Sequence, residues 1–186
     1  LEMVDQKYFF TQFRYDALQK AKEKQKLLLD SEKTKKTSLN LHERPYLGTV
    51  GAIALDKNGN LAAATSTGGM TNKMTGRIGD SPIIGSGTYA DNDSVAVSCT
   101  GTGDIYMRVN AAHEVSALYK YKTSDVQKAA EEAVKEVKAL GGSGGIISID
   151  KHGHTGFAWT KDKLGMYHGE ARLGAKPIVY WPLGEK

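Results

Sequence analysis

The sequence contains a single cysteine, Cys99, so no disulfide can form within the chain. One unpaired cysteine fits a reducing compartment. No apolar run approaches the roughly 20 residues that a membrane-spanning helix needs. The opening residues 1–5 lack the basic start and the apolar core of a secretory signal. These absences together predict a cytoplasmic protein that has no membrane partner.

Aromatic residues are absent from the most basic part of the chain. The 186 residues carry a formal net charge of +4, and the lysines cluster in the region 20–36. No aromatic side chain interleaves with these lysines to stack on bases. We therefore predict no nucleic-acid partner, and we favour a solvated helix that runs into a linker over a polyanion-binding arm.

The chain divides into three zones, and its length suits one globular domain. Residues 1–28 show helical spacing, residues 29–48 are polar and read as a flexible linker, and residues 49–186 form the compact part. The first zone is rich in large apolar side chains and does not begin with methionine. We expect that an N-terminal portion is missing from this sequence.

Strand and helix signals alternate through the compact part. Strands are predicted at 49–55, 60–66, 83–89, 94–99, 145–150 and 155–160, and helices at 105–119 and 124–140. Ser124 and Gln127 suggest a capping box for the last helix, and Gly141 a stop. Helical spacing predicts an apolar face of this helix that consists of Val126, Ala130, Ala133, Val134 and Val137. The tail, 165–186, is loosely patterned. Strand pairs separated by helices indicate an α+β layered sandwich.

The junction between Gly48 and Thr49 is the most informative point of the sequence. The polar segment ends there, and Thr49 opens an apolar strand. Cleavage of this peptide bond would give Thr49 a free α-amine, whose unperturbed pKa is about 7.7–8.0. Such an amine can take the proton of the threonine's own hydroxyl, which creates a nucleophile. The alternative is an ordinary threonine at the start of a strand.

Three further polar clusters lie at the ends of predicted strands. Thr67 follows the strand that pairs with the one opened by Thr49, so its hydroxyl could reach that residue. Arg77 and Asp80, three residues apart on a loop, could hold the carboxylate and ammonium of an amino acid. Residues 100–104, Thr-Gly-Thr-Gly-Asp, precede a helix and could bind an oxyanion or a phosphate.

Each cluster also has a simpler interpretation. Thr67 could belong to a glycine-rich turn, and Arg77 and Asp80 could form a surface ion pair. Residues 100–104 taken alone could make a phosphate-binding module, although they match neither a P-loop nor a dinucleotide fingerprint. His152 and His154 lie in a predicted hairpin turn, and no metal site is predicted there because further ligands are lacking.

Taken together, the four clusters resemble one family. The segments TVGA (49–52), ATSTGGM (64–70), GRIGDSP (76–82) and SCTGTGD (98–104) are similar to motifs of the plant-type L-asparaginase / isoaspartyl peptidase (β-aspartyl peptidase) family. These proteins are N-terminal nucleophile (Ntn) hydrolases. The resemblance implies an αββα sandwich and a precursor that cuts itself between Gly48 and Thr49, so that α and β subunits remain associated.

The resemblance also implies what lies outside this chain. Residues 1–28 resemble the end of the family's α segment, most of which is missing here. The missing part supplies strands of the sandwich and a loop that binds a monovalent cation, sodium. No cofactor is required for the chemistry, and the expected assembly is an (αβ)₂ dimer.

The same resemblance assigns roles to site residues. It makes Thr49 the nucleophile, Thr67 the threonine that orients it, and Thr100 with Gly101 the oxyanion hole. Arg77 is expected to bind the substrate's α-carboxylate, and Asp80, helped by the Gly103 backbone, its α-amine.

The implied activity is an autocatalytically processed amidohydrolase. It would cleave asparagine and β-aspartyl dipeptides through an acyl-enzyme. Glycosylasparaginase and a non-catalytic binding paralogue are the alternatives that the sequence leaves open.

Overall fold

A computed structural model describes residues 3–32, 48–160 and 165–180 of the chain. Most of the predicted linker, 33–47, lies outside these described residues. Two compact units are present. The first contains 3–32 together with 69–77, and the second contains the remaining described residues.

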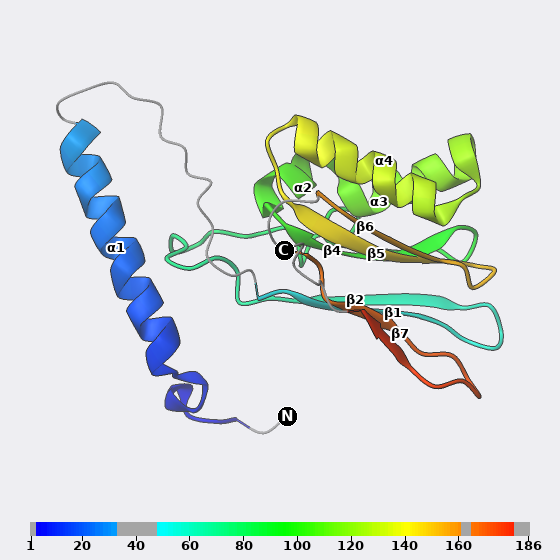
Figure 1. Ribbon diagram of the computed structural model, residues 1–186, viewed down its shortest axis with the longest axis horizontal. Coiled ribbons are helices and arrows are strands. Elements are labelled where there is room, and N and C mark those ends of the chain that lie inside the picture. The colour runs from blue at the N-terminus through cyan, green and yellow to red at the C-terminus, as the bar shows by residue number, and fades with distance from the viewer. Residues whose placement is uncertain (1–2, 33–47, 161–164, 181–186) are drawn as a thin grey trace. The chain divides into compact units, whose positions relative to one another are not determined.

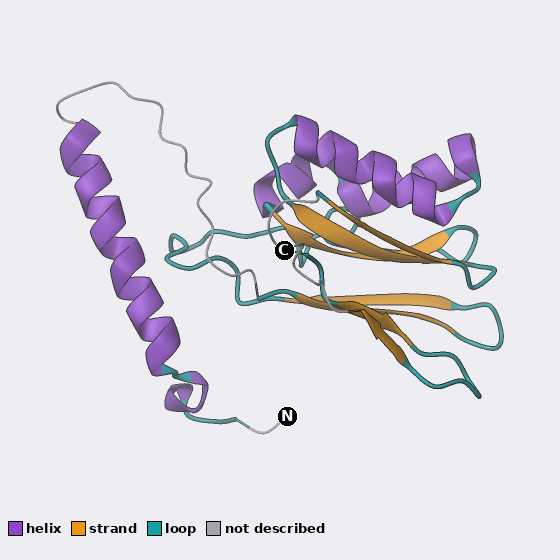
Figure 2. Ribbon diagram, in the orientation of Figure 1, coloured by secondary structure: helices purple, strands orange, loops and turns teal. Residues whose placement is uncertain are grey.

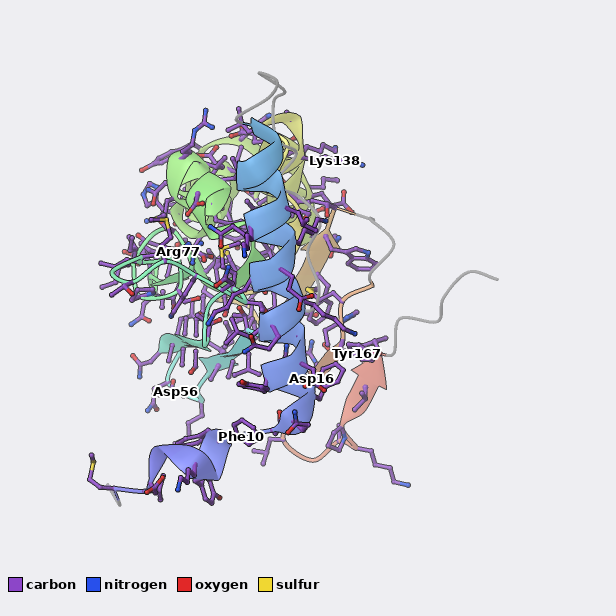
Figure 3. All side chains as sticks on the ribbon, turned by 90° about the vertical axis from the view of Figure 1, so that its left-hand side faces the viewer. Phe10, Asp16, Asp56, Arg77, Lys138 and Tyr167 are labelled. Atoms are coloured by element: carbon purple, nitrogen blue, oxygen red, sulfur yellow. The ribbon has the colours of Figure 1, made fainter. Side chains whose placement is uncertain are left out.

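The first unit is built on one long helix. A short 3₁₀ turn, η1 (Gln6–Phe9), precedes α1 (Gln12–Glu32), so the helix continues past the predicted boundary at residue 28. Phe10 lies between the two, with its ring 5.8 Å from that of Tyr15 (Figure 3). The Asn72 side-chain amide donates to the Gln25 side chain at 2.6 Å, which ties the 69–77 segment to α1.

The second unit is organised around an antiparallel sheet of four strands. Their order is β3 (Thr88–Ala90), β4 (Val95–Gly101), β5 (Gly144–Asp150) and β6 (Thr155–Trp159). The long pair β4–β5 runs in register from Val95 opposite Asp150 to Gly101 opposite Gly144. The predicted hairpin formed by β5 and β6 is confirmed.

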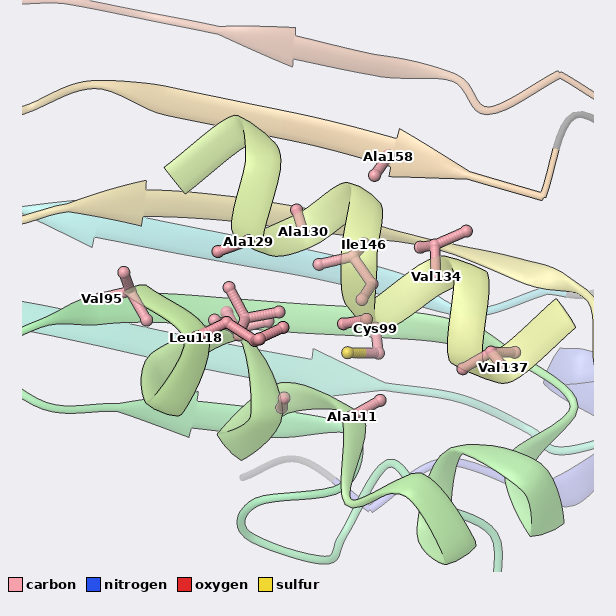
Figure 4. Close-up of a cluster of buried hydrophobic side chains, with 14 of the residues drawn as sticks. Val95, Cys99, Ala111, Leu118, Ala129, Ala130, Val134, Val137, Ile146 and Ala158 are labelled. Carbon is pink, nitrogen blue, oxygen red and sulfur yellow. The ribbon is translucent and has the colours of Figure 1, made fainter. Parts of the chain in front are cut away.

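Three helices cover one face of this sheet (Figure 1). They are α2 (Gly103–Val109), α3 (Ala111–Leu118) and α4 (Val126–Ala139). The apolar side chains between helices and sheet form the core of the unit (Figure 4). The apolar face expected for the last helix is confirmed, since its members are all buried: Val126, Ala130, Ala133, Val134 and Val137.

A two-stranded hairpin packs on the other face of the sheet (Figure 2). It consists of β1 (Val50–Leu55) and β2 (Leu61–Ser66), as the sequence predicted. The second unit is therefore layered as helices, four-stranded sheet and hairpin, an α+β arrangement. In the described part of the chain, no helix has the length and apolarity needed to cross a membrane.

The tail contains a hairpin that the sequence analysis missed. β7 (His168–Glu170) pairs with β8 (Ile178–Tyr180). The His168 ring stacks on that of Tyr180, with centroids 4.7 Å apart, and lies 4.4 Å from the Phe157 ring of β6. Three-residue strands held by ring contacts leave too short a pattern for periodicity to detect.

Two predicted elements are wrong in extent. The strand expected at 83–89 is reduced to β3, because turn hydrogen bonds from Ser86 and Gly87 to the Ile83 carbonyl fold the preceding residues back. The helix expected at 105–119 is two helices. Asn110 adopts a left-handed conformation (φ 54°) between α2 and α3, a backbone state that Asn tolerates better than most residues.

The predicted capping box of α4 is also wrong. Asp125, not Ser124, caps the helix, and its carboxylate accepts from the Lys128 N–H at 3.1 Å. Gln127 instead bonds the main chain of Phe157 on β6, donating at 3.1 Å and accepting at 2.9 Å. The predicted stop is confirmed, since Gly141 follows the helix with φ 78°.

Candidate active site

Two threonine hydroxyls meet at the open end of the β1–β2 hairpin. The register of the hairpin pairs Val50 with Ser66, so the next residues out are Thr49 and Thr67. The Thr49 hydroxyl donates to Thr67 Oγ1 at 3.0 Å. The expected proximity of these residues is confirmed, and Thr49 directly precedes β1.

Contacts between the layers fix which end of β4 lies beneath this pair. At the start of β2, the Leu61 N–H donates to the Asn92 side chain at 2.7 Å. Further along, Thr65 Oγ1 lies 2.6 Å from Ser98 Oγ. β2 and β4 therefore run in the same direction, and Thr67 lies at the end where β4 reaches Thr100.

Glycines allow the backbones to approach closely at this end. Gly101 has φ 150°, and a Cβ added there would lie 2.2 Å from the Ser143 carbonyl oxygen. Gly144 has φ 147°, and a Cβ there would lie 2.0 Å from the Thr100 carbonyl oxygen. Real Cβ atoms do not approach so closely, so both positions require glycine.

The turn from β4 into α2 is clamped by Thr102, whose importance the sequence analysis missed. Its N–H donates to the Ser143 carbonyl at 2.8 Å, and its hydroxyl accepts from the Ser143 N–H at 2.9 Å. Gly103 then opens α2 and is buried. The pairing could not be read from spacing, because 41 residues separate the partners.

Asp80 is a buried residue in the loop that precedes β3. Only 6% of this residue is exposed. A Cβ on Gly87 would lie 2.5 Å from the Asp80 carbonyl oxygen, while the Gly87 carbonyl accepts from the Cys99 N–H at 2.9 Å. Burial, and next the charge of Asp80, raise the pKa of the Cys99 thiol. Cys99 is therefore a neutral core residue.

Arg77 closes the 69–77 segment, which belongs to the first unit. Its N–H donates to the Met74 carbonyl at 3.1 Å. Among the described residues, no group of three or more His, Cys, Asp or Glu side chains could hold a metal. His154 in the β5–β6 turn instead bonds Asp150 at 2.9 Å.

Comparison with known proteins identifies the family of this chain. A family model described as "Asparaginase" matches residues 1–176. This chain belongs to the asparaginase family. Membership implies the Ntn-hydrolase fold, and the helices and antiparallel sheets of the second unit agree with it.

The curated relatives of this chain are named isoaspartyl peptidase or isoaspartyl peptidase/L-asparaginase. Isoaspartyl peptidase of Escherichia coli (strain K12) is 46% identical over 180 residues, covering 96% of this chain and 54% of that protein. Isoaspartyl peptidase of Salmonella typhimurium is 46% identical over 172 residues, covering 92% and 53%. Human isoaspartyl peptidase/L-asparaginase is 43% identical over 143 residues, covering 76% and 46%. The chain spans about half the length of these relatives.

Proposed function

We propose that this chain forms the catalytic half of an amidohydrolase that cleaves asparagine and β-aspartyl peptides. The observation that carries the proposal is the 3.0 Å hydrogen bond between Thr49 and Thr67 at the junction where the nucleophile is expected. Membership of the asparaginase family and the names of the relatives support the reaction class. Those names favour this activity over glycosylasparaginase.

Maturation would come first: hydrolysis of the Gly48–Thr49 bond leaves a carboxylate on Gly48 and liberates the α-amine of Thr49. In our proposal the amine takes the hydroxyl proton, and Oγ1 attacks the side-chain carbonyl carbon of the substrate. The C–N bond then breaks, and the leaving ammonia or amine takes the proton held by the Thr49 ammonium. Water attacks the resulting ester, and aspartate is released. Thr67, which accepts from the hydroxyl, would orient the nucleophile.

The remaining assignments complete the proposed site. Thr100 and Gly101 would stabilise the tetrahedral oxyanion, and losing one such donor typically costs about 10²–10³ in rate. Asp80 and the Gly103 backbone would bind the substrate's α-amine, and Arg77 its α-carboxylate, as a bidentate partner. Anchoring both α-groups would present the side-chain carbonyl to Thr49 and disfavour ordinary α-peptides.

The proposed organisation has a helical end of the α segment that extends to Glu32, a linker that ends at Gly48, and a β subunit (49–186). The outward face of the β1–β2 hairpin supports the presence of further chain. Its residues are exposed and mostly small and apolar: Val50, Ala52, Ala54, Ala62, Ala64 and Ser66. We propose that the remainder of the α segment completes an αββα sandwich over this face and that the enzyme is a cytoplasmic (αβ)₂ dimer.

The test uses the full-length gene product that contains this chain. We expect a fragment whose first Edman residue is Thr49, with release of aspartate from β-aspartyl dipeptides and of ammonia from asparagine. Thr49→Ala should abolish both cleavage and turnover. Thr155→Ala is the matched control, since Thr155 also opens a strand and its hydroxyl donates to Glu170 at 3.1 Å. Appreciable turnover by Thr49→Ala would refute the nucleophile.

The role of Arg77 has a separate test. Removing a guanidinium that binds the substrate's carboxylate should raise KM for asparagine by about tenfold or more, since a charge-assisted bond contributes about 1.5–3 kcal/mol. Steady-state kinetics of Arg77→Ala measures this. Lys73→Ala, on the same segment, should leave KM unchanged. An unchanged KM in Arg77→Ala would contradict the role.

A further inference from the structure

Three residues form a contact between the hairpin and the sheet next to the proposed site. Ser98 of β4 reaches towards β1 and β2, and its hydroxyl lies 2.6 Å from that of Thr65. Gly51 is the cross-strand partner of Thr65. A Cβ on Gly51 would lie 2.1 Å from Ser98 Oγ, so the serine occupies the space that a side chain at 51 would take. We call Gly51, Thr65 and Ser98 the interlayer contact.

The directions of the hydrogen bonds in this contact follow from donor counting. The Thr65 hydroxyl also bonds the Gly87 carbonyl at 3.1 Å, and a carbonyl can only accept. The single proton of Thr65 is therefore used there, and Ser98 must donate to Thr65. Ser98 is 4% exposed, so its hydroxyl is satisfied through this contact and away from solvent.

Each member of the contact lies two residues along the chain from a proposed site residue, which lies in the same strand or directly beside its end. Gly51 follows Thr49, Thr65 precedes Thr67, and Ser98 precedes Thr100. Two residues of a strand span about 7 Å, and residues i and i+2 share a face. The contact therefore fixes the separation between the nucleophile pair on the hairpin and the oxyanion donors on β4.

The contact also reaches the loop that carries Asp80. Gly87, which accepts from Thr65, packs its backbone against the Asp80 carbonyl and accepts from the Cys99 N–H. The Thr65 hydroxyl thus links the hairpin to β4 and to the loop that carries Asp80.

We propose that Ser98 and Thr65 are positioning residues, which hold Thr49 and Thr67 at working distance from Thr100 and Gly101 without touching substrate. The inference rests on the proposed function, because it assigns these hydroxyls a part in that reaction. A shift of about 1 Å in a reacting group can cost about 100-fold in rate. Loss of either hydroxyl lowers kcat, and KM changes little because neither Ser98 nor Thr65 is itself an α-group anchor.

The test compares variants of the full-length protein by kcat, KM and melting temperature. Ser98→Ala and Thr65→Val each lower kcat by about 10- to 100-fold with KM within about threefold. Thr65→Ser keeps the donor and restores most of kcat. Ser116→Ala is the matched control: it breaks a buried hydroxyl pair with Ser94, 2.8 Å long, on the helix side of the sheet. That control lowers the melting temperature and leaves kcat unchanged.

Three outcomes separate this inference from the proposed function. If the wild-type protein is active and Ser98→Ala and Thr65→Val keep kcat within twofold, the positioning role is wrong. It is also wrong if Ser116→Ala loses as much kcat as they do. If the wild-type protein is inactive, the proposed function fails. Crystal structures of wild type and Ser98→Ala then decide: a Thr49–Gly101 separation that is unchanged overturns the inference, and a wider one supports it.

Discussion

The two faces of β4 are built from different side chains. The helix face is apolar and at most 2% exposed, and it consists of Val95, Val97 and Cys99. The hairpin face consists of Ala96, Ser98 and Thr100, where hydroxyls replace apolar bulk. Helix-face residues pack with the core of three helices, whereas the hairpin face meets a layer of glycine, alanine and threonine.

This difference separates stability from chemistry within one strand. Apolar burial contributes roughly 25 cal/mol per Å², so most of the stabilisation in this unit comes from the helix face. The hairpin face buries little apolar surface. Its small side chains instead let β4 approach β1 and β2 closely, and this close approach brings the hydroxyls within hydrogen-bond distance. Substitutions on the helix face should therefore change stability, and those on the hairpin face should change rate.

The largest effect is expected at Gly101, the last residue of β4. In Gly101→Ala, the new Cβ would lie 2.2 Å from the Ser143 oxygen, in a backbone state that disfavours side chains. We expect little folded protein and no detectable turnover, measured by circular dichroism and aspartate release. Gly59→Ala is the control, since Gly59 has φ 84° but nothing within 4 Å of its added Cβ. Equal damage in both variants would show that backbone strain, not the collision, is responsible.

Truncating a core side chain on the helix face of the sheet should lower the stability of the protein and leave its rate unchanged. Ile146 on β5 is 0% exposed and packs in the core cluster opposite Cys99. Ile146→Ala should lower the free energy of unfolding by about 2–5 kcal/mol, measured by urea denaturation. Well below its melting temperature the variant should keep kcat. Ile149 lies on the opposite face of β5 and is half-buried, so Ile149→Ala should lower stability less than Ile146→Ala does. A larger loss of stability in Ile149→Ala would show that the hairpin face, not the helix face, stabilises this unit.

The sequence predicted the parts of this arrangement that depend on local pattern. The β1–β2 hairpin, and with it the Thr49–Thr67 pair, followed from an apolar run and a second short strand, which are joined by a few residues that contain glycine. The apolar stripe of α4 followed from helical spacing. These signals lie within a few residues of the structure that they determine.

Contacts between distant segments could not be predicted in the same way. Ser98 and Thr65 are 33 residues apart, and neither differs by type from any other strand hydroxyl. Asn110 splits α2 from α3 through a left-handed backbone that helical periodicity does not encode. Gln127 does not take part in the predicted capping box, because its side-chain amide bonds both the N–H and the carbonyl of Phe157 in the folded state.

A hairpin-face substitution should lower the rate and leave stability almost unchanged. Thr67→Val removes the acceptor of the Thr49 hydroxyl, and Thr67 is exposed. We expect kcat to fall about 10- to 100-fold, equivalent to about 1.4–2.7 kcal/mol of barrier, while the free energy of unfolding changes by less than about 0.5 kcal/mol. Thr67→Ser should recover most of the rate. If Thr67→Ser stays as slow as Thr67→Val, hydroxyl bonding to Thr49 is not what matters.

The smallest effect is expected on the helix side, at the start of α4. The backbone N–H of Lys128 donates to Asp125 and lowers the pKa of its carboxyl from the usual 3.8. A depressed pKa in the folded state means that this stabilisation is present above pH 3.8 and is lost as the pH falls through the folded value. Asp125→Ala should cost about 1 kcal/mol at pH 7.

Asp125→Asn provides the matched variant, because its amide oxygen can still cap the helix but does not titrate. It should unfold at pH 7 with nearly the wild-type free energy and lose less stability than wild type on acidification. Urea denaturation at pH 7 and pH 3 measures both. Neither variant should change kcat, since the cap lies on the helix side of the sheet; a rate effect from Asp125 would show that the two faces are coupled through α4.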